Sequence, residues 1–184
     1  RLAAREEPEL RSRFEALLAV ASTADRQEVL SQYSAAATMT GDLKRGAKLF
    51  ETKCSSTCHK VGDKGYDVGP NLVSLTNKTP QALLAAILDP SQAVEPKFLN
   101  YTVITIDGLI YTGILVSETG TSITLLGPED KQQVILRSEV EQMQSSGKSM
   151  MPDGFEKELT LQDCADIMAF VAGGSDSVSS AGGN

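Results

Sequence analysis

The chain has few of the residues and segments that many function classes require. Its 184 residues include one histidine and three cysteines, and only 5% are aromatic. No apolar run approaches the roughly 20 residues that a transmembrane helix needs, so we expect no membrane span. Acidic residues outnumber basic ones, 24 against 17, and the net charge of −7 argues against nucleic acid or an anionic membrane as the main partner. A hydrophobic content of 41% still predicts a globular chain.

The first 39 residues are predicted to form a helical hairpin. Apolar residues recur at helical spacing from Leu10 to Ala21, and Pro8 suits the first turn of such a helix. A second helix is expected to begin near Asp25 and to run toward Met39. The run "ALLAVASTA" has the composition of a signal-peptide end, but four glutamates precede it and favour a helix. Because the chain does not begin with methionine, we expect it to be processed or cut from a longer protein.

Three more helices have recognisable starts. Asp42 is a capping residue before an apolar helical face in "TGDLKRGAKLFETKC". Thr79 and Pro80 open the next helix, which should end at Asp89, because the residue before a proline disfavours helix. Thr160 caps the last helix, "TLQDCADIMAFVAG". Between the first two of these helices, "GYDVGPNLVSLTNK" is predicted to be a loop.

A segment rich in β-branched residues separates the last two helices. Asp107-Gly108 between such runs is a strong hairpin signal, and two further glycine-containing turns follow. The alternation predicts four antiparallel strands, near residues 99–106, 109–117, 121–126 and 131–136. The next stretch, "SSGKSMMPDGF", is predicted to be a loop, and the small-residue C-terminal tail to be disordered.

The segment "CSSTCHK" carries the clearest chemical signal. Covalent haem attachment needs two thiols on one face to bond the vinyl groups, and an adjacent imidazole to ligate iron. The usual motif has two residues between the cysteines, whereas three separate Cys54 from Cys58 here. Helical positions four apart still share a face, so a local bulge would absorb the added residue. Cys54, Cys58 and His59 therefore predict a haem site.

Two other interpretations of these cysteines stay open. A zinc site would draw its four ligands from Cys54, Cys58, His59 and Cys164, but adjacent Cys58 and His59 would struggle to bind one ion. A disulfide between Cys54 and Cys58 would close a very short loop and leave His59 unexplained.

A methionine is the natural second axial ligand, because His59 is the only histidine in the chain. The stretch "SMMPDG" offers Met150 and Met151 in a loop bounded by glycine and proline, where burial in a core does not explain them well. The remaining methionines have simpler structural explanations: Met39, Met143 and Met168.

These parts follow the order of a class I cytochrome c, which the chain resembles. More closely, residues from Gly41 to about Gly173 are similar to the haem-binding domain of secreted planctomycete and verrucomicrobial proteins. The matching stretches are "RGAKLF", "CHKVGDKGYDVGPNL", "ILDPSQAVEPKF", "TIDGLIYTGILV", "SMMPDGFEKELT" and "DIMAF". The added residue between the cysteines departs from the family pattern.

The resemblance implies a role for each site residue. Cys54 and Cys58 would form the thioethers, and His59 would be the proximal iron ligand. Met151 would be the distal ligand, with neighbouring Met150 as the alternative. The Pro70 carbonyl would accept the proton of the second ring nitrogen of His59, which fixes the ring and raises its basicity.

The resemblance also implies contacts within the fold. Gly46 and Phe50 are expected to meet the last helix around Phe170, as the first and last helices do in such proteins. Cys164 on that helix is expected to be a buried small hydrophobe rather than a ligand.

The predicted fold is a mainly α cytochrome c core with an inserted antiparallel β-sheet, α+β overall, preceded by the helical hairpin. The predicted divisions are a hairpin at 1–39, a cytochrome c domain at 40–174 with the β insertion at 99–137, and a disordered tail at 175–184.

The predicted function is one-electron transfer through a single covalent haem c with His/Met ligation. We expect an electron carrier rather than an enzyme, serving as the terminal domain of a larger exported redox protein. Its partners would be redox proteins or an upstream dehydrogenase domain. Covalent attachment implies a periplasmic or otherwise extracytoplasmic location.

Two alternatives belong to other classes. A haem-based enzyme or gas sensor would have a displaceable distal methionine, and the lack of a second histidine argues weakly against it. The other is a zinc-stapled binding module without redox function.

Overall fold

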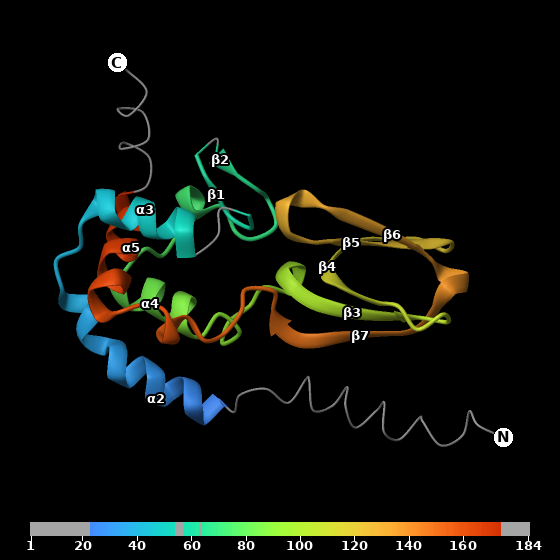
Figure 1. Ribbon diagram of the computed structural model, residues 1–184, viewed down its shortest axis with the longest axis horizontal. Helices are drawn as coiled ribbons and strands as arrows, with labels where there is room; N and C mark the ends of the chain where they lie inside the picture. Colours follow the sequence, from blue (N-terminus) through green and yellow to red (C-terminus); the bar gives the residue numbers. More distant parts are fainter. Residues whose placement is uncertain (1–22, 54–56, 63, 174–184) are drawn as a thin grey trace, which may run out of the picture.

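The computed structural model describes residues 23–53, 57–62 and 64–173. Helices gather at one end of the elongated molecule and a five-stranded antiparallel sheet forms the other end (Figure 1). No helix among these residues is long and apolar enough to cross a membrane.

The helical part contains four α-helices and short 3-10 turns. The α-helices are α2 Thr23–Tyr33, α3 Leu43–Lys53, α4 Pro80–Leu88 and α5 Leu161–Gly173. The 3-10 turns of this part are η1 Ser34–Thr38, η2 Leu72–Ser74, η3 Pro96–Phe98 and η6 Phe155–Lys157. Two further short segments connect strands of the sheet: η4 Pro128–Asp130, which has non-helical backbone at Glu129, and η5 Arg137–Glu139. The second helix of the predicted hairpin is confirmed as α2 continued by η1. Its first helix and the predicted C-terminal tail lie outside the described residues.

Local capping explains where the later helices begin. The Asp42 carboxylate accepts a hydrogen bond of 2.9 Å from the Arg45 amide, which satisfies a free donor in the first turn of α3. Thr160 and Asp163 cap α5 reciprocally, with each side chain accepting from the other's amide, at 3.2 and 2.9 Å. Pro80 occupies the first turn of α4, where its missing N–H costs nothing. The helix starts predicted from these residues are confirmed.

Helices α3 and α5 touch through their backbones. A Cβ atom added at Gly46 would lie 2.0 Å from the Asp166 carbonyl oxygen, so only glycine allows this approach. One turn further along, the rings of Phe50 and Phe170 pack with centroids 5.5 Å apart. The predicted contact of Gly46 and Phe50 with the last helix is confirmed.

A buried carboxylate joins the same two helices. Asp166 is fully buried and accepts hydrogen bonds of 2.8 Å from the Asp42 amide and from Gln162 Nε2, and it forms an ion pair with Arg45. Burial alone would raise the pKa of Asp166, but these hydrogen bonds and the guanidinium lower it below its ordinary value. The carboxylate therefore stays charged and holds the start of α3 against α5.

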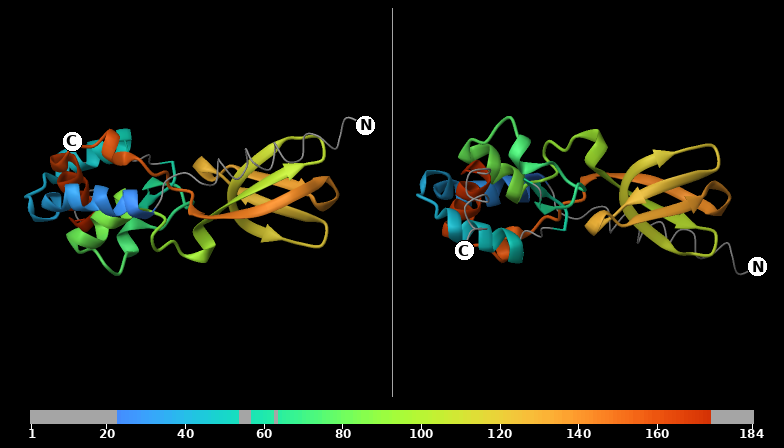
Figure 2. Two further views of the ribbon diagram at one scale, coloured as in Figure 1. Left: turned by 90° about the horizontal axis from the view of Figure 1, so that it is seen from below. Right: turned by 90° about the horizontal axis from the view of Figure 1, so that it is seen from above.

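Strands β3 to β7 form the larger sheet, in the spatial order β6-β5-β4-β3-β7. Their bounds are β3 Leu99–Thr105, β4 Ile110–Glu118, β5 Ser122–Leu126, β6 Gln132–Leu136 and β7 Val140–Ser149. The sheet is strongly curled, as the perpendicular views in Figure 2 show. Its concave side encloses a small core of its own, formed by Val103, Ile123, Leu125 and Ile135.

The four predicted strands are confirmed as β3 to β6, but the sequence analysis missed a fifth strand. Val140–Ser149, part of which was predicted to be a loop, is a fifth strand that pairs with β3, with Val103 opposite Met143. Its polar sequence "EQMQSSGKS" has no apolar alternation, because pairing with a central strand rather than its own pattern determines its conformation. The sheet therefore continues past residue 137, where it was expected to end.

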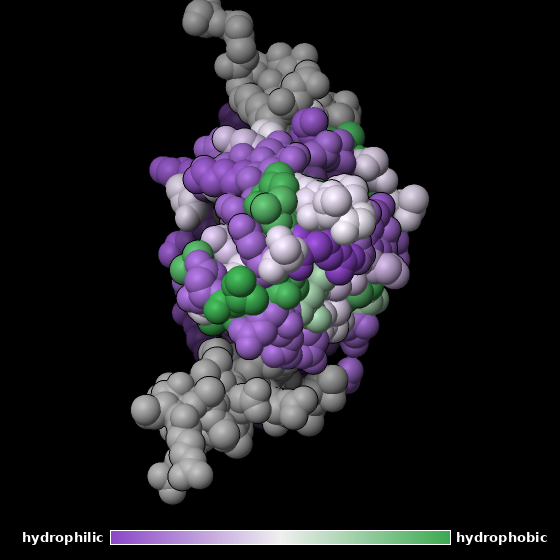
Figure 3. Space-filling model, turned by 90° about the vertical axis from the view of Figure 1, so that its right-hand side faces the viewer, coloured by the Kyte–Doolittle hydropathy of each residue, from purple (hydrophilic) through white to green (hydrophobic). Residues whose placement is uncertain are grey.

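Apolar side chains are exposed at the end of the sheet far from the helices. They are Ile106, Leu109 and Ile110 around the β3–β4 turn, and Val134 and Leu136 in edge strand β6. Figure 3 looks onto this end and shows apolar groups separated by polar ones. The surface visible from this side therefore has no continuous apolar face.

The helix contact predicts a large effect for a single methyl group. Gly46→Ala gains up to about 1 kcal/mol of helix propensity but forces a Cβ against backbone, and such overpacking costs about 1–3 kcal/mol. Because the clash is with a carbonyl that cannot move alone, the cost should lie at the upper end of this range, and we expect a net loss of about 1–2 kcal/mol in the free energy of unfolding, measured by urea denaturation.

The matched control is Gly120→Ala, since a Cβ at Gly120 meets nothing within 4 Å. It should change the free energy of unfolding by less than about 0.5 kcal/mol. Equal stability of the two variants would contradict the backbone contact.

Candidate functional site

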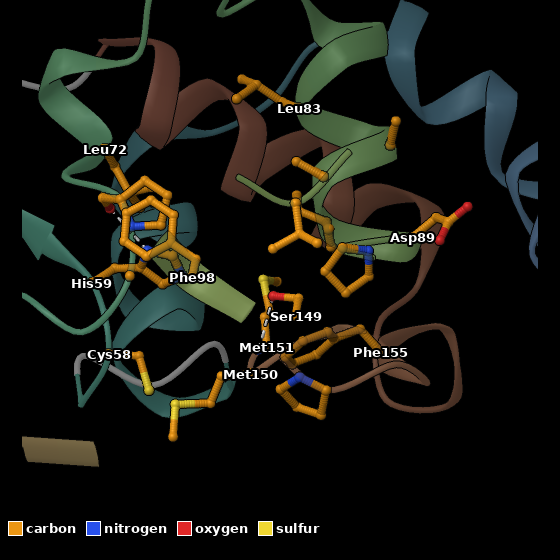
Figure 4. Close-up of a pocket in the computed structure, with 18 of the residues that line it drawn as sticks. Cys58, His59, Leu72, Leu83, Asp89, Phe98, Ser149, Met150, Met151 and Phe155 are labelled. Atoms are coloured by element: carbon orange, nitrogen blue, oxygen red, sulfur yellow. Dashed lines mark hydrogen bonds between the residues drawn. The ribbon is translucent and has the colours of Figure 1, made fainter. Parts of the chain in front are cut away.

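A mostly apolar cavity of about 670 Å³ lies where the helical part meets the sheet. This volume lies within the range of roughly 300–1,000 Å³ that is typical of small-molecule and cofactor sites. Helix α4 and the segment after it form much of the wall (Figure 4). The cavity also contains four of the residues that the sequence analysis singled out: Cys58, His59, Pro70 and Met151, together with the alternative, Met150.

The His59 ring is held by the loop that follows it. His59 Nδ1 lies 2.9 Å from the Pro70 carbonyl oxygen. A carbonyl can only accept, so Nδ1 carries the proton and Nε2 keeps its lone pair. Burial lowers the pKa of His59 below its ordinary value, although the bond to Pro70 opposes this shift. The site therefore presents a neutral imidazole with one nitrogen available to a metal.

Two glycines make room for this histidine. A Cβ added at Gly69 would lie 2.6 Å from His59 Cε1, and one added at Gly65 would lie 2.2 Å from the His59 carbonyl oxygen. The Gly69 amide also donates a 2.6 Å hydrogen bond to the Cys58 carbonyl oxygen. Gly65 ends the small hairpin of β1 Lys60–Val61 and β2 Lys64–Gly65, at φ +94°. The sequence analysis placed both glycines in a predicted loop and missed their close approach to His59.

The methionines come from the loop after β7. The Met151 amide donates to Ser149 Oγ at 3.1 Å, and the Ser149 amide donates to Ser91 Oγ at 3.2 Å. These bonds tie the loop to the segment after α4. Figure 4 shows Met151 among the side chains in the middle of the cavity, whereas Met150 runs toward Cys58.

Helix α2 holds the chain that follows Met151. Arg26 binds Glu156 through two parallel contacts of 3.0 and 2.9 Å, and both side chains are largely buried. The Tyr33 hydroxyl lies 2.8 Å from both the Glu156 and Leu159 carbonyl oxygens. The bond to Arg26 lowers the pKa of Glu156, although burial opposes this shift. No motif indicated this pairing, because its partners are far apart in the sequence.

The three cysteines have different positions. Cys58 is half-buried and lines the cavity. Cys54 lies outside the described residues. Cys164 is fully buried in the helical core, as predicted, and is not among the residues of the cavity wall. Among the described residues, no three His, Cys, Asp or Glu side chains are grouped to hold a metal ion.

A comparison with protein families supports part of the sequence interpretation. The family model for cytochrome c matches residues 43–100. These residues include α3, the Cys-His segment, Pro70 and α4, so the match supports a cytochrome c-type domain with covalently bound haem and a general role in electron transfer. The matched segment ends before the methionine loop. No curated protein matches the chain.

The residues of the cavity fit a haem group. An apolar wall suits a large flat ring, a lone-pair nitrogen of imidazole is a common iron ligand, and a thiol beside it can form a thioether. A thioether sulfur on the methionine loop adds a soft donor of the kind that c-type haems use.

The contact between Gly69 and His59 predicts that Gly69→Ala displaces the imidazole. The added methyl group would overlap the ring, so the bond from Nδ1 to Pro70 should break. Because the chain has one histidine, its ring proton gives a single assignable NMR signal. In the haem-free protein we expect the Nδ1 proton, protected from exchange in the parent chain, to exchange at least tenfold faster in the variant.

Gly120→Ala is again the control, since its Cβ would meet nothing within 4 Å. An unchanged ring signal in Gly69→Ala would contradict the described packing of Gly69 on His59.

Proposed function

We propose that the chain transfers single electrons through one covalently bound c-type haem with His59 and Met151 as axial ligands. The observation that carries this proposal is the composition of one apolar cavity. A thiol, a neutral imidazole and a methionine thioether, from segments far apart in the chain, all line it. The cytochrome c match over residues 43–100 supports the same function.

Each residue has a separate role in this proposal. Cys58, together with Cys54, bonds the vinyl groups, and His59 Nε2 ligates the iron. Pro70 keeps the His59 proton on Nδ1, which orients the ring and raises the basicity of the ligating nitrogen. Met151 would supply its sulfur as the second ligand of the iron, from the loop that Ser149 and Ser91 hold in place.

The bound haem would supply a one-electron couple between ferric and ferrous iron. The protein adjusts this couple through the thioether ligand and through burial. Methionine ligation favours the ferrous state and so raises the reduction potential of a c-type haem. The apolar wall excludes water, and a low-dielectric surrounding favours the less charged state of the site.

The biological setting is also part of the proposal. We propose a carrier domain within a larger exported redox protein, periplasmic or otherwise extracytoplasmic, since covalent haem attachment accompanies export. The proposed cytochrome c domain spans residues 40–174 and includes the sheet. Its partners would be redox proteins or an upstream dehydrogenase domain.

Covalent attachment is tested by mass. When the chain is expressed with a working haem maturation system, acid extraction should leave one haem on the denatured protein, visible in the intact mass. A Cys58→Ser, His59→Ala double variant should lose the bound haem and serves as the control. Release of all haem from the parent chain by acid would overturn the covalent site.

Alanine variants of the two neighbouring methionines test which of them is the distal ligand. Met151→Ala should lower the reduction potential by well over about 59 mV, the shift that corresponds to a tenfold change in a one-electron equilibrium. It should also open the iron to added imidazole, which a visible spectrum detects.

Met150→Ala removes a similar volume from the same cavity. It should neither lower the reduction potential nor open the iron to added imidazole. If the two variants behaved in the opposite way, Met150 would be the ligand.

A further inference from the structure

Among the described residues, the turn between β5 and β6 contacts the Cys-His segment. Between β5 and β6, the Glu129 amide donates a 2.8 Å hydrogen bond to the Thr57 carbonyl oxygen. In the same turn, Asp130 Oδ1 accepts a 3.2 Å bond from the Asp67 amide. Figure 1 shows this end of β5 and β6 beside β1 and β2. The turn therefore holds the chain both before Cys58 and shortly after His59.

The turn has a conformation that its residues disfavour. Glu129 and Asp130 both have positive φ, 60° and 54°, and the Lys131 amide bonds back to the Pro128 carbonyl at 3.2 Å. Two-residue turns with positive φ at both central positions normally contain Asn-Gly, Asp-Gly or Gly-Gly. Glutamate is uncommon in the left-handed backbone region, because its Cβ would crowd the following carbonyl oxygen. Such a conformation persists where surrounding contacts determine it, and it is a recurrent feature of functional sites.

The contact falls on the part of the motif that is unusual. Thr57 is the third residue between Cys54 and Cys58, where the common haem motif has two. An added residue brings an added peptide group, and such a group needs a hydrogen-bond partner when it is removed from water. The Glu129 amide is a partner for the carbonyl of Thr57. On the other side, the Cys58 carbonyl is bound by the Gly69 amide.

We propose that the β5–β6 turn is a positioning element of the haem-attachment segment. Glu129 holds the Thr57 carbonyl through its backbone N–H, and Asp130 holds the loop after His59 at Asp67. Together they keep Cys58 and His59 directed into the cavity despite the three-residue spacing. The role in haem attachment rests on the proposed function, whereas the positioning of Cys58 and His59 can be tested without haem.

Amide hydrogen exchange in the haem-free protein tests the positioning. Glu129→Pro removes the N–H and cannot adopt a positive φ. We expect the Gly69 amide and the Nδ1 proton of His59 to exchange at least tenfold faster, while Val103 and Ile123 in the sheet core keep their protection.

The matched variant is Glu129→Gly, which keeps the N–H and tolerates a positive φ. It should retain the protection at Gly69 and His59 within threefold of the parent chain. If Glu129→Pro left both groups as protected as in the parent chain with the sheet core intact, the proposal would be overturned.

A second pair decides the question if Glu129→Pro fails to fold. Asp130→Asn keeps a side-chain acceptor, and Asp130→Gly removes it while still tolerating the positive φ. At least tenfold faster exchange of the Asp67 amide and of His59 Nδ1 in the glycine variant alone would support the proposal, and equal rates in both would overturn it. A parent chain without covalent haem would overturn the proposed function, yet these rates would still measure the positioning.

Discussion

The close contact between α3 and α5 is the constraint on which the rest of the structure depends. Gly46 lets the two backbones meet, and the buried carboxylate of Asp166 binds the amide that precedes α3. Helix α3 leads directly into the Cys-His segment, and α5 follows the methionine loop. Fixing these two helices against each other therefore restricts where His59 and Met151 can lie, even though neither residue takes part in the contact.

Features with local causes were predictable from the sequence. A capping aspartate, a proline in a first turn and a capping threonine each act within one helical turn, so the starts of α3, α4 and α5 followed from the residues alone. The Cys-His motif and the Gly-Pro pair of the next loop are also local. The contact between His59 and Pro70 was expected from the resemblance to class I cytochromes c rather than from the local sequence.

Features with distant causes were missed. Strand β7 has a polar sequence and is a strand because β3 offers it a partner, with Thr102 opposite Gln144. The bidentate pair of Arg26 and Glu156 joins residues more than a hundred positions apart, and neither belongs to a motif. The left-handed turn at Glu129 contradicts its own residue preferences. Such contacts depend on the tertiary structure, so the local sequence does not predict them.

The proposed haem site also has one part with local causes and one part with distant causes. Its proximal wall, from α3 through Pro70, is a nearly continuous stretch of chain, and it is also the part that the cytochrome c family model matches. Its distal wall depends on the sheet, because β7 delivers Met150 and Met151 only after pairing with β3. Long-range pairing of this kind forms late, since loop-closure entropy opposes it. In the proposed site, the proximal residues would therefore come together before the methionine loop reaches the cavity. The sheet would reach the site at two places, through the loop after β7 and through the bond from the Glu129 amide to the Thr57 carbonyl oxygen.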